Sequence, residues 1–312
     1  MNISTTLSGT VALAHWGVIR AQGADAVSFL QGQLTQDVVK LGADQAALSG
    51  YCSAKGRLLA SFVICKPAAD EVLLLCHRSL LAATLKRLQM FVMRAKCTLS
   101  DASEALPLFG AVGSAGTAIA PDLPVWGYAS NCLRLPDAAG LERRVVIAPQ
   151  PQPAASLSFD DWKWLEVRSA IATIEAATVD LFVPQMLNYE QLGGVNFQKG
   201  CYPGQEIVAR SQFRGTIKRR AYLFETDGPI AVGQEVFHSS DAAQPAGLVV
   251  NVARNPGASG FSALVEVKIA ALEGGSLHAG VVEGSAEADD GGGKSGSTLN
   301  LCALPYAMSL EI

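Results

Sequence analysis

A change of pattern at residue 221 most constrains what this chain can fold into. Before it, strand-like and helix-like stretches alternate, which is typical of a mixed α+β protein. After it, the sequence contains short strand-like runs separated by Gly, Pro, Asp and Ser turns, and these runs cover residues 221–225, 234–238, 246–252 and 261–269. Short strands with such turns predict a small C-terminal β-barrel over residues 221–312.

The first part of residues 1–220 has the order of an α+β sandwich. Asp25 is a candidate N-cap for a short helix that carries Phe29 and Leu30. Strand-like residues 46–52 and 57–66 flank the turn Ser53-Ala54-Lys55-Gly56 and predict a hairpin. Three further elements follow, namely a strand over 71–76, a helix capped by Ser79 and a strand over 95–99. This order predicts helices packed on one face of a sheet.

Alternating prolines mark a chain crossing near residues 148–157. Pro149, Pro151 and Pro153 can continue neither a helix nor a central strand, so we expect an extended linker here. Ser158, with Asp161 three residues later, then predicts a capped helix over residues 160–173. Residues 283–297 are rich in Gly, Ser and acidic residues and predict a flexible loop ahead of a final strand that contains Leu301, Ala303 and Tyr306.

Composition argues against several classes of function. The 312 residues include 24 Lys and Arg against 28 Asp and Glu, a formal net charge of -4, so no global positive field favours nucleic acid or an anionic membrane. Seven cysteines without CxxC spacing argue against a disulfide framework, and four scattered histidines show no metal-binding spacing. We therefore expect reduced thiols, no stable metal site and a cytoplasmic location. We expect no secretory signal. We also expect no membrane span, because the most apolar stretch is interrupted by His77, Arg78, Lys86 and Arg87.

One segment, residues 196–210, carries the strongest chemical signal. Gly200 and Gly204 bracket Cys201, Tyr202 and Pro203, a composition for a tight turn that brings the main chain close to another segment. A helix should follow directly, with Pro203 in its first turn and Glu206 at the positive end of its dipole. Cys201 then lies ahead of a helix N-terminus and two residues from Lys199, and both features favour the thiolate.

Several of these residues also have a purely structural interpretation. Cys201 could be a small buried hydrophobic residue, as Cys65 and Cys76 are expected to be in their apolar strands. Tyr202 could stack on a ligand or pack in the core. Five cations lie within eleven residues and form either a solvated surface or a local anion site; they are Arg210, Arg214, Lys218, Arg219 and Arg220.

The motif belongs to a longer match with a known family. Residues 182–185, 192–195, 199–210 and 213–215, together with 29–37, 52–57 and 164–171, closely resemble the YgfZ family, which comprises folate-binding relatives of the glycine-cleavage T-protein. The resemblance covers most of residues 25–225. It implies two interleaved α+β domains and a C-terminal β-barrel around a central opening that holds tetrahydrofolate or a derivative. It also implies a role in assembly or repair of iron–sulfur enzymes, including those that thiolate tRNA, with Cys201 as the functional thiol.

The resemblance also implies a set of ligand-binding residues. They are Lys199, Gly200, Tyr202, Gly204, Gln205, Glu206, Arg210 and Arg214, with Trp164 and Arg168 from the preceding helix. Because Arg168 follows Trp164 by four residues, both lie on one helix face, and we expect Arg168 to line the opening. The cations after residue 209 become candidates for contacts with folate glutamates, a protein partner or RNA. The expected partners are folate and iron–sulfur client or cluster-assembly proteins, without direct nucleic-acid or membrane contact.

One departure from the relatives bears on mechanism. In the T-protein, the strand after the hairpin turn carries aspartates where folate and the aminomethyl group react, whereas this chain has Ala60 and Ser61 there. Neither residue titrates near neutral pH, which argues against aminomethyl transfer. Two alternatives stay open: a folate-dependent one-carbon transferase, and a non-catalytic interaction module with structural folate and an inert Cys201.

Overall fold

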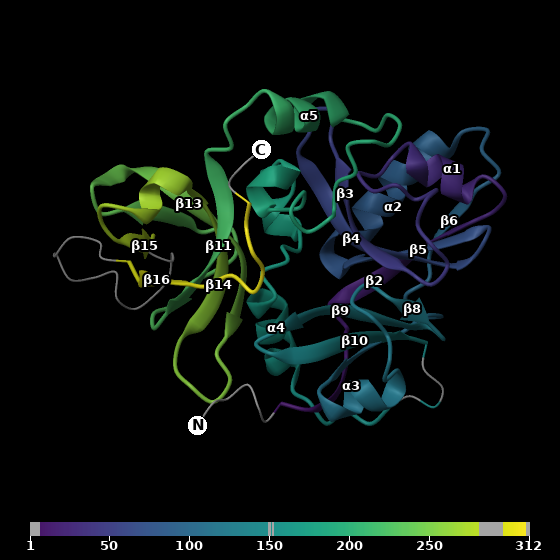
Figure 1. Cartoon of the computed structure of the whole chain (residues 1–312), viewed down its shortest axis with the longest axis horizontal. Coiled ribbons are helices and arrows are strands. Elements are labelled where there is room, and N and C mark those ends of the chain that lie inside the picture. Colours follow the sequence, from purple (N-terminus) through teal and green to yellow (C-terminus); the bar gives the residue numbers. More distant parts are fainter. Residues whose placement is uncertain (1–6, 149–150, 152, 281–295, 310–312) are drawn as a thin grey trace.

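The computed structural model describes residues 7–148, 151, 153–280 and 296–309, which form two five-stranded sheets and a closed six-stranded barrel. Figure 1 shows the two sheets on one side of the molecule and the barrel on the other, with α4 (Phe159–Arg168) between them. The predicted α+β fold with a C-terminal β-barrel is confirmed. No helix in these described ranges is both long and apolar enough to cross a bilayer.

The first sheet contains the predicted hairpin. Its strands, in spatial order, are β3 (Ala46–Cys52), β4 (Leu58–Ala68), β5 (Glu71–His77), β2 (Trp16–Gln22) and β6 (Thr98–Asp101). All neighbours in this sheet are antiparallel, and Tyr51 pairs with Ala60 beside the turn. Helices α1 (Ala26–Gln31) and α2 (Arg78–Val92) belong to the same unit, and α2 buries Leu81 and Leu88.

The second sheet is interleaved with the first along the chain. Its strands, in spatial order, are β1 (Gly9–Ala12), β7 (Leu108–Val112), β10 (Leu141–Ile147), β9 (Cys132–Ala138) and β8 (Tyr128–Ala129). The chain starts in this sheet with β1, builds the whole first sheet, and returns to pair β7 with β1. Helices α3 (Ser114–Ile119) and α4 cover it, and one apolar core joins Val63 and Leu75 of the first sheet to Val145 and Ile147 of the second.

The barrel follows the strand-like runs predicted after residue 221. Its strands are β11 (Arg219–Thr226), β14 (Phe261–Lys268), β13 (Asp241–Arg254), β12 (Glu235–His238), β15 (Leu277–Ala279) and β16 (Thr298–Cys302). The last strand ends before Ala303 and Tyr306, so their predicted place in it is wrong. Tyr306 instead donates a hydrogen bond to the Ala170 carbonyl and ties the C-terminal segment to the core. The loop predicted over 283–297 falls mostly on residues 281–295, which lie outside the described residues.

Several predicted helix ends differ from the structure. His77, not Ser79, occupies the N-cap of α2 and accepts a hydrogen bond from the Ser79 amide. Ser158 caps α4 as predicted, but the helix ends at Arg168 because the chain turns at Ala170, where φ is +52°. In the part of the chain that the structure describes, the remaining helical segments are α5 (Gln205–Phe213) and three 3-10 turns, Ala176–Thr178, Pro184–Leu187 and Ile269–Leu272. Residues 153–157 form neither helix nor strand, while the rest of the predicted linker lies partly outside the described ranges.

Candidate functional site

Two loops that the sequence analysis singled out lie against each other. Gly204 has a φ of +79° and Gly56 a φ of +70°, both in the left-handed region. A Cβ on Gly204 would lie 2.3 Å from the Ser53 carbonyl oxygen and 2.6 Å from the Gly56 Cα. The hairpin turn and the cysteine loop therefore touch through their glycine backbones. A helix follows the cysteine loop as predicted, but α5 begins at Gln205, so Pro203 precedes the Gly204 cap and does not lie in the first turn.

Lys199 joins the cysteine loop to the end of α1 and to the segment that follows it. Its ammonium donates hydrogen bonds to the carbonyls of Gln31 and Leu34, both 2.5 Å away, and lies 5.1 Å from the centre of the buried Tyr202 ring. Burial lowers the pKa of Lys199 to about 8, although Asp37 opposes the shift. The contacts of the Lys199 ammonium are thus with main-chain carbonyls and the Tyr202 ring. None of these contacts supports the expectation that Lys199 favours a Cys201 thiolate.

Cys201 differs from the other cysteines in its exposure. It is exposed at the start of the loop before α5, so its interpretation as a buried hydrophobic residue is wrong. Burial raises the pKa of Cys52, Cys65 and Cys76 to about 12, with nearby carboxylates adding to the effect. These three thiols are packing residues at neutral pH. Cys201 is the one exposed cysteine among the described residues, although Cys302 is half-buried.

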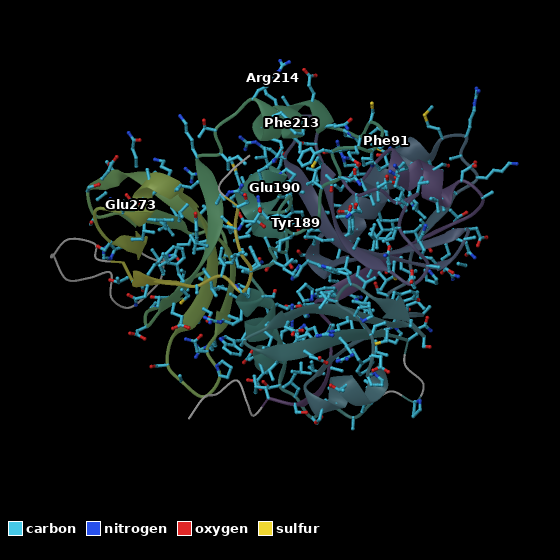
Figure 2. The ribbon with its side chains drawn as sticks, viewed as in Figure 1. Phe91, Tyr189, Glu190, Phe213, Arg214 and Glu273 are labelled. Carbon is cyan, nitrogen blue, oxygen red and sulfur yellow. The ribbon has the colours of Figure 1, made fainter. Side chains whose placement is uncertain are left out.

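The run of cations does not form one anion site. Arg220 is buried and pairs with Glu190 at 2.6 Å, and Arg219 pairs with Glu266. Arg210 pairs weakly with Glu206, one turn earlier on α5. Figure 2 shows Phe213 and Arg214 at the outer end of α5, away from the centre of the molecule. The structure therefore distributes these predicted anion ligands between internal ion pairs and the outer surface.

Trp164 and Arg168 face the barrel. The Trp164 indole nitrogen donates to the Ser262 hydroxyl of β14 at 3.1 Å. Arg168 lies over the Trp164 ring at 5.9 Å and pairs with Glu225 of β11 at 2.9 Å. The two side chains share a helix face as predicted. The expectation that Arg168 lines a central opening stays a prediction: its charge pairs at the contact between α4 and the barrel, and it is not among the residues that line the cavity described next.

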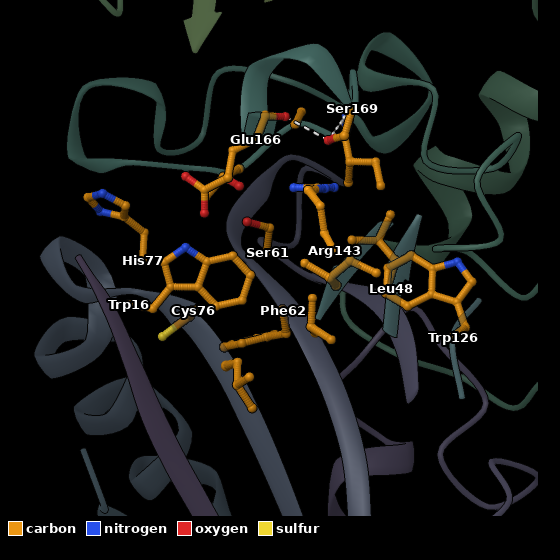
Figure 3. Close-up of a pocket in the computed structure, with 16 residues that line it drawn as sticks. Trp16, Leu48, Ser61, Phe62, Cys76, His77, Trp126, Arg143, Glu166 and Ser169 are labelled. Atoms are coloured by element: carbon orange, nitrogen blue, oxygen red, sulfur yellow. Dashed lines mark hydrogen bonds between the residues drawn. The ribbon is translucent and has the colours of Figure 1, made fainter. Parts of the chain in front are cut away.

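The central cavity is lined by the opposite side of α4. It encloses about 40 Å³, room for about three waters, and forms the floor of a depression of about 470 Å³ that is partly open to solvent. Figure 3 shows its polar and aromatic walls, which come from both sheets, α4 and a connecting loop: Trp16, Ser61, His77, Trp126, Arg143, Glu166 and Ser169.

Glu166 is the carboxylate of this cavity. Both of its oxygens lie within 3.0 Å of the His15 Nε2, and Oε1 also accepts a hydrogen bond from the Trp162 indole at 2.8 Å. Burial works to raise the pKa of Glu166, but these hydrogen bonds and the charge of Arg143 outweigh it and lower the pKa. Glu166 is therefore ionised at neutral pH. Burial lowers the pKa of His77 despite the opposing charge of Glu175, so His77 is neutral there.

Arg143 and Trp16 complete the polar wall. Arg143 is buried, donates to the Pro136 carbonyl at 3.0 and 3.2 Å and lies 5.8 Å from the Trp162 ring centre. Burial lowers the pKa of Arg143 to about 10, which leaves it charged at neutral pH. The buried indole nitrogen of Trp16 has no hydrogen-bond partner among the described residues. A buried donor without a partner is costly, so this nitrogen marks a place for a ligand acceptor or a water.

Sequence reasoning did not select Glu166, Arg143 or Trp16. Glu166 lies within residues 164–171, which carry part of the family resemblance, and it follows Trp162 by four residues. A charged residue on the buried face of a helix was the sequence signal that could have identified it. Arg143 and Trp16 lie on strands more than 100 residues apart, so their approach depends on the tertiary fold. No group of three His, Cys, Asp or Glu side chains in the described ranges is arranged to hold a metal ion.

Sheets, barrel and central cavity together define a protein of the aminomethyltransferase fold. The crystal structure of glycine cleavage system aminomethyltransferase T from Bartonella henselae superposes with a TM-score of 0.72, covering 97% of this chain and 88% of that chain. Identity is 15%, so this likeness concerns the fold alone. No family model matches the chain.

Sequence comparison is more specific. The chain is 32% identical over 231 residues to the tRNA-modifying protein YgfZ of Edwardsiella ictaluri (strain 93-146), covering 67% of this chain and 69% of the relative. It is also 32% identical over 230 residues to the YgfZ of Yersinia pseudotuberculosis serotype O:1b (strain IP 31758), covering 68% and 69%. The chain belongs to the YgfZ family.

Proposed function

We propose that this chain is a folate-binding accessory protein that supports iron–sulfur enzymes, including those that thiolate tRNA. Its relatives carry the name tRNA-modifying protein, which favours a role connected with tRNA modification. The chain's formal charge of -4 favours an indirect role, through client or cluster-assembly proteins, over direct contact with tRNA. Such a role places the protein in the cytoplasm.

The observation that carries the folate proposal is the cavity wall. A pterin ring presents adjacent N–H donors on one edge and acceptor atoms elsewhere. The ionised Glu166 can accept the donors, and the partnerless Trp16 nitrogen can donate to an acceptor. Aromatic and apolar side chains such as Trp126 and Phe62 provide flat walls. The enclosed 40 Å³ is small for a bicyclic ring, so binding uses the wider depression and moves lining side chains.

The thiol and the cavity have separate positions. Cys201 does not line the central cavity, and its side chain is exposed beside α5. Folate bound in the cavity would stabilise the two sheets and α4 against each other, while Cys201 would remain accessible to a partner protein. This division favours an accessory protein over an enzyme whose thiol attacks bound folate.

A one-carbon transferase is the second candidate, favoured by the presence of Glu166. The hydroxyl of Ser61 lines the cavity and accepts a hydrogen bond from the Ile174 amide, and Ala60 is buried. The strand thus lacks the T-protein carboxylate, but Glu166 supplies one from α4. A turnover assay with an aminomethyl donor and tetrahydrofolate distinguishes the candidates, and the accessory function predicts no methylene-tetrahydrofolate.

Substitution of Cys201 tests the accessory function. Cys201→Ser keeps nearly the same volume but removes a nucleophile and soft metal ligand, so we expect an unchanged melting temperature and folate affinity. The variant should fail to restore iron–sulfur enzyme activity in cells lacking this protein. Cys302→Ser is the matched control and should restore it.

Alkylation provides a direct check on the thiol. Cys201 should react with iodoacetamide much faster than Cys65 in the folded protein, as measured by mass spectrometry of tryptic peptides. Full complementation by Cys201→Ser, or equal modification rates, would count against sulfur chemistry and favour the interaction module.

A further inference from the structure

A wider groove opens beside the central cavity. It has a volume of about 400 Å³ and is bordered by the loop after α1, the start of β3 and loops around residues 124–127 and 192–196. Its walls carry polar side chains, including Gln36, Lys40, Gln45 and Asn196. Among the described residues, Leu48 and Trp126 alone line both the groove and the cavity. Figure 3 shows these two side chains together, at the end of the cavity away from His77.

Trp126 has an unusual backbone conformation. Its φ is +62°, in the left-handed region that bulky residues rarely occupy. Two backbone hydrogen bonds enforce it: the Trp126 amide donates to the Arg134 carbonyl at 2.8 Å, and the Ala46 amide donates to the Trp126 carbonyl at 2.7 Å. Strain of this kind persists where the surrounding structure fixes it, and it concentrates at ligand sites. Here it holds the indole at the junction of the two spaces.

We propose that the cavity and the groove are two compartments of one ligand site, and that Trp126 selects ligands whose flat ring carries a second ring and a polar tail. This inference rests on the proposed folate function and extends it. The pterin occupies the cavity beside Glu166, and the p-aminobenzoyl ring passes between Trp126 and Leu48. The amide of the tail meets the side-chain amides of the groove.

The charged side chains of the groove determine how much the glutamate tail adds to the binding affinity. Lys40 lies 3.9 Å from Asp37, and Asp44 adds a second carboxylate to the same groove. Cations and anions are therefore mixed, and no positive field gathers around the tail. Glutamates beyond the first extend into solvent. Tetrahydrofolate with one glutamate and with three should bind with affinities within about twofold of each other.

The test compares two ligands on three proteins. Tetrahydrofolate and a tetrahydropterin without the benzoylglutamate extension are titrated by calorimetry into the wild type, Trp126→Gly and Ala139→Gly, with melting temperatures measured in parallel. Trp126→Gly removes the indole while glycine accepts the same φ. Ala139 has a φ of +51° in the turn between β9 and β10 and lines neither space, so Ala139→Gly relieves similar strain without touching the site.

We expect Trp126→Gly to weaken tetrahydrofolate binding by about tenfold, the equivalent of a lost aromatic stacking contact. It should change tetrahydropterin binding by less than about twofold, and Ala139→Gly should match the wild type. Suppose that the wild type binds tetrahydrofolate, and that Trp126→Gly either binds both ligands as tightly as the wild type does or loses affinity for both by the same factor. The selective role of Trp126 is then overturned while the folate function stands. If the folded wild type binds neither ligand, the folate function itself fails.

Discussion

At the scale of single residues, glycine backbones set how closely the two motif loops approach. Gly204 combines a φ of +79° with a backbone contact that leaves no room for a Cβ. Gly193 has a φ of +72° but open space around it, and Gly200 has open space without a positive φ. The three positions therefore separate the cost of backbone strain from the cost of a clash.

We expect Gly204→Ala to lower the free energy of unfolding by about 2 to 5 kcal/mol, the sum of left-handed strain and overpacking. Gly193→Ala should cost only the strain, about 1 to 2 kcal/mol, and Gly200→Ala should change stability by less than about 0.5 kcal/mol. Urea unfolding measures all three. Equal losses for Gly204→Ala and Gly193→Ala would show that the loops are not in contact.

Lys199 gives a prediction about pH. Its folded-state pKa of about 8 lies below the ordinary value of 10.5, so between these pH values the unfolded chain holds a proton that the folded chain lacks. The contribution of Lys199 to stability therefore rises as the pH increases from about 8 to 10.5. The unfolding free energy of the wild type minus that of Lys199→Met should therefore increase over this window, as measured by urea titrations. A difference independent of pH would contradict the burial of this ammonium.

At the scale of elements, local signals located most helices and strands but not their ends. Ser158 predicted the start of α4 because a cap is a contact within one turn. The end of α4 depends on Ala170, whose carbonyl accepts a hydrogen bond from Tyr306, 136 residues later. The N-cap of α2 is His77 and not the predicted Ser79, because the Ser79 hydroxyl contacts the His77 ring and the Ala176 amide instead. Such ends are set by tertiary contacts that a sequence window does not contain.

The cations around α5 and β11 give a prediction at this scale. Arg220 and Glu190 are 3% and 4% exposed, and this pair joins β11 to the segment that follows the 3-10 turn Pro184–Leu187. Arg220 also donates a hydrogen bond to the Gln185 carbonyl within that turn. Arg220→Met leaves the Glu190 charge buried and should cost about 3 to 5 kcal/mol. Arg210 is 63% exposed in its pair with Glu206, so Arg210→Met should cost less than about 1 kcal/mol. Similar losses in thermal and urea unfolding would contradict the distinction between internal and surface pairs.

At the scale of the whole molecule, the sequence predicted the fold better than the site. The family resemblance and the change of pattern at residue 221 were sufficient for the α+β core and the barrel. They also selected the loops around Gly56 and Cys201, which the structure brings into contact through Gly204. The cavity escaped prediction because Trp16, Arg143 and Glu166 come from β2, β10 and α4, and only the interleaving of the sheets unites them.

The most direct test of the central claim is calorimetric titration of the wild type and Glu166→Gln with tetrahydrofolate. We predict that the wild type binds and gains stability, about 2.7 kcal/mol at a ligand concentration of one hundred times Kd. Glu166→Gln removes the charge from the cavity wall, so it should remain folded and bind at least about tenfold more weakly, while the surface variant Arg210→Met should bind like the wild type. A folded wild type that shows neither heat of binding nor a shift in melting temperature at millimolar tetrahydrofolate would contradict the account.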